Sequence, residues 1–179
     1  METLEQLDQL GGPLGGVVAG VRPDQLDLPT PAGTFTVRGV LEHMVGGATA
    51  FTAAFRGEAP SEPDLSDPLA AFGPALGGLL DAIKAPGALE KTIESPFGEV
   101  TGEFFARYLV IDGLVHGWDI ATATGQPYDP PAELVAEADG FAHQIIDQFR
   151  DGEAFGAAVE PAPDATPIEK LAAYTGRQP

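Results

Sequence analysis

The sequence predicts an all-α protein, a bundle of four or five substantial helices with one short β-hairpin or extended excursion near residues 88–101. Apolar residues recur at three- and four-residue spacing over several long stretches, which is the pattern of amphipathic helices. Prolines and glycines mostly punctuate these stretches, where they end helices and form loops. Long helices joined by loops of this size are typical of a four-helix bundle.

Local signals set the expected helix boundaries. Pro13 is expected to kink the first helix, because proline cannot donate a backbone hydrogen bond. Thr36 is a candidate N-cap for the second helix. Asp67 followed by Pro68 is a strong start signal for the third, and Gly125 with Pro127 stops the fourth. Helices are therefore expected over residues 2–21, 37–56, 68–84, 103–124, 131–150 and 167–175.

Residues 88–101 break the helical pattern. Ile93 and Val100 stand on either side of the Pro96-Phe97-Gly98 turn. An apolar residue on each side of a Pro-Gly turn favours a short hairpin.

The bulk composition indicates one globular domain over residues 1–179. A chain of 179 residues with 44% hydrophobic and 20% charged residues can bury a sizeable core. The formal net charge of −18 repels phosphate backbones and anionic lipids, so we expect no nucleic-acid or membrane partner. The charge is otherwise explained by solubility, or by a patch that collects cations.

The chain contains no cysteine. A disulfide framework, a cysteine-ligated zinc site and a protein thiol nucleophile are all excluded. Acidic residues interrupt the N-terminal segment, so we expect no signal peptide, and no apolar run is long enough to span a membrane. A cytoplasmic location is therefore expected.

Asp112 and His116 are the residues with the clearest chemical potential. They are four apart on the predicted fourth helix, so their side chains leave the same face. A carboxylate and an imidazole in this arrangement suit zinc or another divalent first-row metal. The same spacing equally fits a surface ion pair. Asp119, three residues further on, is either a carboxylate that orients a ligating histidine or a solvated or helix-bonded residue.

A third ligand must come from another helix. His43 lies midway along the second helix, in a row of small residues that leaves space beside an imidazole. It is also explained as an ordinary core or surface histidine. His143, on the fifth helix, is a weaker candidate ligand, and Trp118 is expected in the core or in a pocket wall.

Three segments together resemble a known family. Residues 114–125 read LVHGWDIATATG, residues 36–47 read TVRGVLEHMVGG, and the Pro96-Phe97-Gly98 turn lies between them. These segments, with the closing stretch 165–179, resemble the actinobacterial DinB/YfiT-like group that is similar to the N-terminal domain of mycothiol-dependent maleylpyruvate isomerases. The resemblance covers nearly the whole chain.

The resemblance implies a DinB-like four-helix bundle with a divalent metal held by His43, Asp112 and His116. Zinc is expected, with nickel and iron as alternatives. The isomerase-like members use glutamate where this chain has Asp112, and a cysteine is common in the family where this chain has Ala32. The isomerases also carry a second, C-terminal domain, which is not expected here, so full maleylpyruvate isomerase activity is not expected either.

The function that the resemblance implies is a metal-dependent transferase or isomerase-like enzyme using a low-molecular-weight thiol such as mycothiol. Its partners would be that thiol and an electrophilic substrate, whose carboxylate Arg38, Arg56 or Arg107 would hold. The alternatives are a non-catalytic metal-binding or stress-response protein, metal-assisted hydrolysis with Asp119 or Glu42 as base, and a purely structural bundle. A homodimer through bundle faces is a further expectation from the resemblance.

Overall fold

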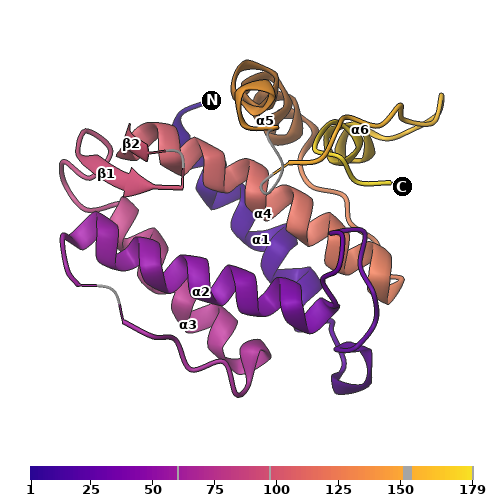
Figure 1. Ribbon diagram of the computed structural model, residues 1–179, viewed down its shortest axis with the longest axis horizontal. Coiled ribbons are helices and arrows are strands. Elements are labelled where there is room, and N and C mark those ends of the chain that lie inside the picture. The colour runs from indigo at the N-terminus through magenta and orange to yellow at the C-terminus, as the bar shows by residue number, and fades with distance from the viewer. Residues whose placement is uncertain (60, 97, 151–154, 179) are drawn as a thin grey trace. The chain divides into compact units, whose positions relative to one another are not determined.

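The computed structural model describes residues 1–59, 61–96, 98–150 and 155–178 (Figure 1). The described part of the chain is mostly helical and contains one small antiparallel sheet, which confirms the predicted fold class. Its helices and strands are α1 (Thr3–Ala19), α2 (Val37–Arg56), α3 (Pro68–Ile83), β1 (Thr92–Ser95), β2 (Gly98–Thr101), α4 (Gly102–Thr124), α5 (Ala132–Ile145) and α6 (Pro167–Tyr174), with 3₁₀ turns at Pro23–Gln25 and Ile146–Phe149.

The observed boundaries follow the predicted ones closely. The Asp67 side chain caps α3 by accepting a hydrogen bond of 3.1 Å from the backbone N–H of Ala70. α1 continues through Pro13 as one helix. The fifth helix is shorter than expected as a regular α-helix, because it tightens into a 3₁₀ turn after Ile145, as helix ends commonly do.

The excursion over residues 88–101 contains a hairpin. β1 and β2 pair antiparallel, with Ile93 opposite Val100 and Ser95 opposite Gly98. Gly98 has a φ of 86°, which glycine adopts without the strain that a Cβ would bring. The Ser95 hydroxyl donates a hydrogen bond of 2.8 Å to the Gly98 carbonyl oxygen. Phe97 lies outside the described residues.

The chain divides into two compact units, which we call unit 1 (residues 1–37 and 107–179) and unit 2 (residues 38–106). In unit 2 the aromatic ring of Phe105 lies 4.2 Å from that of Phe51 and 6.5 Å from that of Phe55, centroid to centroid. Gly102 allows the backbone to pass directly beside the Ala88 carbonyl, since a Cβ there would collide with it. The aromatic contacts connect the first turn of α4 to α2 within unit 2, and Gly102 places the same turn against the segment before β1.

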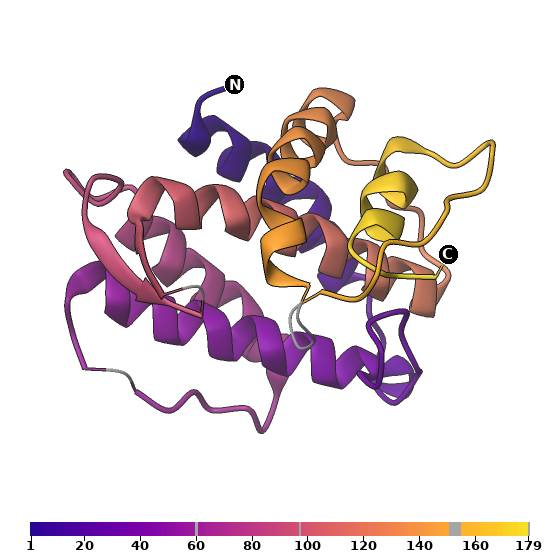
Figure 2. The ribbon, with the colours of Figure 1, turned by 45° about the horizontal axis from the view of Figure 1, so that its top comes forward.

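In unit 1, α5 packs against α1 and α6, and Figures 1 and 2 show α5 and α6 side by side. α1 packs closely on α4, because Gly113 brings the α4 backbone against the buried side chains of Leu10 and Leu14. The Gln126 side chain donates a hydrogen bond of 3.1 Å to the Val17 carbonyl at the end of α1.

No helix among the described residues is both long enough and apolar enough to cross a bilayer.

Candidate metal centre

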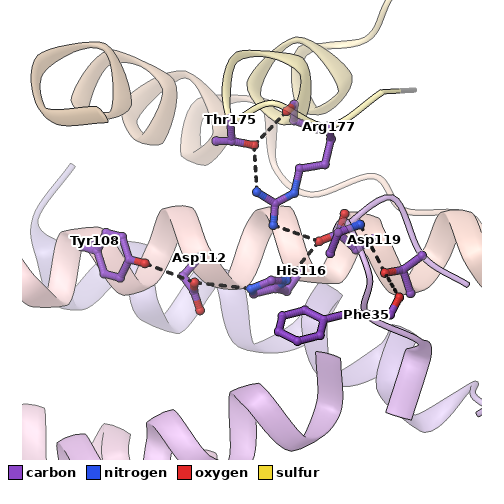
Figure 3. Close-up of polar contacts among 10 residues, drawn as sticks. Phe35, Tyr108, Asp112, His116, Asp119, Thr175 and Arg177 are labelled. Carbon is purple, nitrogen blue, oxygen red and sulfur yellow. Dashed lines mark hydrogen bonds and ion pairs between the residues drawn. The ribbon is translucent and has the colours of Figure 1, made fainter. Parts of the chain in front are cut away.

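A row of polar side chains follows one face of α4 in unit 1. Tyr108, Asp112, His116 and Asp119 are spaced by four, four and three residues, which places them one helical turn apart along that face. Figure 3 shows the four side chains in line, with the guanidinium of Arg177 reaching Asp119 from the C-terminal segment. Because one helix carries the row, its spacing depends only on helical geometry.

His116 lies between two carboxylates. Its Nδ1 is 3.0 Å from Oδ2 of Asp119, and its Nε2 is 3.5 Å from Oδ1 of Asp112. The His116 side chain is only 7% exposed. Since an ionised carboxylate can only accept hydrogen bonds, the Asp119 contact favours the tautomer with its proton on Nδ1. That tautomer presents the Nε2 lone pair toward Asp112.

Asp119 is completely buried, and a single oxygen makes its polar contacts. Oδ2 accepts from His116 Nδ1 and from Nη2 of Arg177 at 3.3 Å. Oδ1 is buried and has no hydrogen-bond partner among the described residues. A buried carboxylate is costly unless it is paired and hydrogen-bonded. The guanidinium of Arg177 provides a permanent positive charge at this point.

Asp112 is half-buried and has a second neighbour in the row. The Tyr108 hydroxyl donates to Asp112 Oδ1 at 3.5 Å. Burial raises the pKa of Tyr108 far above its ordinary value, and the nearby Asp112 charge raises it further, against a smaller opposing effect from Arg177. Tyr108 therefore stays protonated at physiological pH and acts toward Asp112 as a donor.

His43, the third predicted ligand, belongs to unit 2, where it lies on α2 with an exposed side chain. The structure thus brings two of the three predicted ligands, Asp112 and His116, together within one unit.

The structure also places the remaining sequence candidates. His143 is exposed, and its ring stacks on Tyr174 with centroids 3.7 Å apart. Trp118 is buried, as expected.

Arg107 lies over the ring of Phe141 at 3.9 Å. Arg38 is 4.0 Å from Glu42 on the same helix, Arg56 is exposed at the end of α2, and Ala32 lies in the loop before α2.

Sequence reasoning missed Tyr108 and Arg177. Tyr108 could have been found by extending the Asp112–His116 spacing one turn backward. Arg177 is 58 residues from Asp119, and no periodicity connects two residues at that separation. Only the likeness of the closing segment to the family gave any signal there.

The profile of the family described as "Mycothiol maleylpyruvate isomerase N-terminal domain" matches residues 7–121. This range includes His43, Asp112, His116 and Asp119, and it ends before Arg177.

Two relatives come from Mycobacterium tuberculosis, uncharacterized protein MT0763 of strain CDC 1551 / Oshkosh and uncharacterized protein Rv0738 of strain ATCC 25618 / H37Rv. Each is 38% identical over 166 residues, which is 90% of this chain and 90% of the relative. No solved structure matches the chain significantly.

Proposed function

The chain belongs to the mycothiol maleylpyruvate isomerase N-terminal domain family, and from this premise we propose that it is a divalent-metal enzyme that transfers or isomerises through a small thiol. His43, Asp112 and His116 would hold the metal. The thiol would be mycothiol or a close analogue, as the family description suggests. The second substrate would be an electrophile.

The observation that carries the proposal is the position of His116 between Asp112 and Asp119. A charge-assisted hydrogen bond would bring nitrogen and oxygen to about 2.7–2.9 Å, yet Nε2 and Oδ1 of Asp112 are 3.5 Å apart. Two ligands of a tetrahedral zinc ion, with bonds of about 2.1 Å, lie about 3.4 Å from each other. The separation therefore fits two ligands of one ion better than a direct ion pair.

Asp119 supports the same interpretation. Histidine ligands of metals almost always donate their other ring N–H to a carboxylate or carbonyl, which fixes the tautomer and the ring orientation. The 3.0 Å contact from Nδ1 to Asp119 supplies such a partner. Nitrogen and oxygen donors together suit zinc, nickel or iron, and we propose zinc.

His43 would complete a set of three protein ligands, which is the number that catalytic zinc sites use while leaving a position open. A divalent ion in this site would lower the pKa of a coordinated thiol, so that a thiolate is available at neutral pH. The chain has no cysteine, so the sulfur would arrive on a small molecule. Asp112 and His116 would fix the geometry, and Asp119 would keep the imidazole aligned.

We further propose that the protein works in the cytoplasm as a single DinB-like domain, with a homodimer as its assembly. Size-exclusion chromatography with light scattering tests the dimer. A strictly monomeric protein at micromolar concentration would contradict that part of the proposal.

The test of the metal site is elemental analysis of the purified protein beside three histidine variants. Wild type is expected to contain about one equivalent of metal, as three-ligand sites do, and His43→Ala and His116→Ala are expected to lose it. His143→Ala is the matched control, because it removes the remaining histidine, which is exposed and stacked on Tyr174. Metal retained equally in all three variants, or a folded wild type that refuses added zinc, would refute the site.

A thiol conjugation assay then separates an enzyme from a binding protein. Zinc-loaded wild type is expected to speed the consumption of mycothiol by a reactive electrophile, and His116→Ala is expected to remove that acceleration. Zinc and thiol binding without any turnover would favour the alternative, a non-catalytic metal or small-molecule binding protein of the stress-response type.

A further inference from the structure

We propose that Arg177 is a positioning residue of the metal centre, acting on His116 through the carboxylate of Asp119. The inference rests on the proposed function, because it assigns a role toward the metal ligand His116. It concerns the closing segment of the chain, which lies beyond the residues that match the family.

The first observation is the sharing of one oxygen. Asp119 Oδ2 accepts from both His116 Nδ1 and Arg177 Nη2, at 3.0 and 3.3 Å. A carboxylate that swings away from Arg177 would also change its contact with the imidazole. Arg177 therefore restricts the rotation of Asp119, and Asp119 in turn restricts the rotation of the His116 ring.

The second observation is the burial of this group of side chains. Asp119 is 0% and Arg177 13% exposed in their side chains. Arg177 is the one arginine or lysine within ion-pair distance of Asp119 among the described residues. Attraction between opposite charges is strongest where water is excluded. The contact is therefore far less screened than a surface ion pair.

The third observation is how the arginine itself is held. Arg177 Nη1 donates to the Thr175 hydroxyl at 3.4 Å, and that hydroxyl donates to the Ala172 carbonyl of α6 at 2.8 Å. Arg177 Nε is buried with no hydrogen-bond partner among the described residues. The Thr175 hydroxyl at the end of α6 thus orients the guanidinium toward Asp119, and the Nε–H gains no hydrogen bond from this orientation among the described residues.

The experiment compares zinc affinity in Arg177→Gln, Arg177→Lys and Arg150→Ala by competition with a chromophoric chelator. Arg150→Ala is the matched control, because Arg150 donates to the Tyr174 carbonyl at the end of α6 and to the Gly156 carbonyl, and its ion pair is with Asp147 rather than Asp119. Loss of a group that supports a metal ligand typically lowers affinity about 10–100-fold. We expect a loss of this size in Arg177→Gln, affinity close to wild type in Arg150→Ala, and recovery by Arg177→Lys.

A second readout does not require metal. The chain has three histidines, so nitrogen NMR of the metal-free protein can resolve the His116 ring. Wild type is expected to hold the Nδ1-protonated tautomer, and Arg177→Gln to show a mixture of tautomers. In wild type, the guanidinium protons of Arg177 are expected to exchange slowly and to shift when zinc is added.

The outcomes separate this inference from the proposed function. If wild type binds zinc, and Arg177→Gln has the same zinc affinity and the same His116 tautomer as Arg150→Ala, the positioning role is wrong and the metal site stands. Zinc affinity that is equally low in Arg177→Lys and Arg177→Gln would indicate that Arg177 acts through packing alone, and would also overturn its positioning role. A wild type that binds no zinc refutes the proposed function. If Arg177→Gln does not fold, the wild-type guanidinium signals decide, and rapid exchange would contradict the role.

Discussion

The contact between α1 and α4 gives the most direct test of the packing that supports the site. A Cβ added at Gly113 would lie 2.7 Å from Leu10 Cδ2 and 3.3 Å from Leu14 Cδ2. The two leucines are 5% and 1% exposed, so neither can move aside into solvent. Overpacking of this kind costs about 1–3 kcal/mol, whereas replacing glycine by alanine within a helix gains about 1 kcal/mol. Gly113→Ala is therefore expected to lower the free energy of unfolding by about 0–2 kcal/mol.

Gly140→Ala is the matched control for this prediction. Gly140 lies within α5, and an added Cβ there meets nothing within 4 Å. The same gain in helix propensity applies, so the control is expected to be about 0.5–1 kcal/mol more stable than wild type. The two variants should then differ by about 1–3 kcal/mol, which is the packing cost alone.

Urea denaturation of the metal-free protein measures the difference, and unchanged m-values would show that the unfolded states are comparable. Leu10→Ala should cost less stability in the Gly113→Ala background than in wild type, because residues in contact couple by about 0.5–3 kcal/mol. If Gly113→Ala and Gly140→Ala are equally stabilised, the close approach of α1 to α4 at this point is wrong.

Three further outcomes are expected. Asp119→Asn should lower zinc affinity about 10–100-fold, because it removes the charge that faces Arg177 while an amide oxygen can still accept from His116; unchanged affinity in a chelator competition would contradict this. Tyr128→Phe should raise the free energy of unfolding by about 1 kcal/mol. The Tyr128 hydroxyl is buried, which raises its pKa, and it has no hydrogen-bond partner among the described residues. A variant that is less stable than wild type in urea would indicate that the hydroxyl has a partner. Thr166→Ala should cost about 1 kcal/mol, because Thr166 and Glu169 form a capping box at the start of α6; Thr166→Ser should retain most of the stability, and equal loss in both variants would argue against the cap.

Most of the helical organisation could be predicted from the sequence, because local rules decide it. Periodic apolar residues fix which stretches are helical, and the Asp67-Pro68 pair fixes where α3 begins. The 3₁₀ turn after Ile145 could not be predicted, because the way a helix ends depends on the residues packed against its last turn.

The candidate site was predictable only in part, for a similar reason. Four-residue spacing places Asp112 and His116 on one face of α4 whatever the rest of the chain does. The direction of the imidazole depends on what meets Nδ1, which is Asp119 on the same helix, held by Arg177 from a distant segment. Spacing alone therefore could not separate an ion pair from two metal ligands.

The position of Arg177 depends on two glycines, Gly156 and Gly176, which have no chemical role of their own. Gly176 has a φ of 95°, and a Cβ built on it would lie 2.8 Å from the Gly156 Cα. Backbone meets backbone there, so no rotamer change can absorb an extra methyl group. In a saturation-mutagenesis screen for zinc retention, Gly176 should therefore be as intolerant of substitution as the proposed ligands, although it belongs neither to the proposed ligand set nor to the row of side chains on α4.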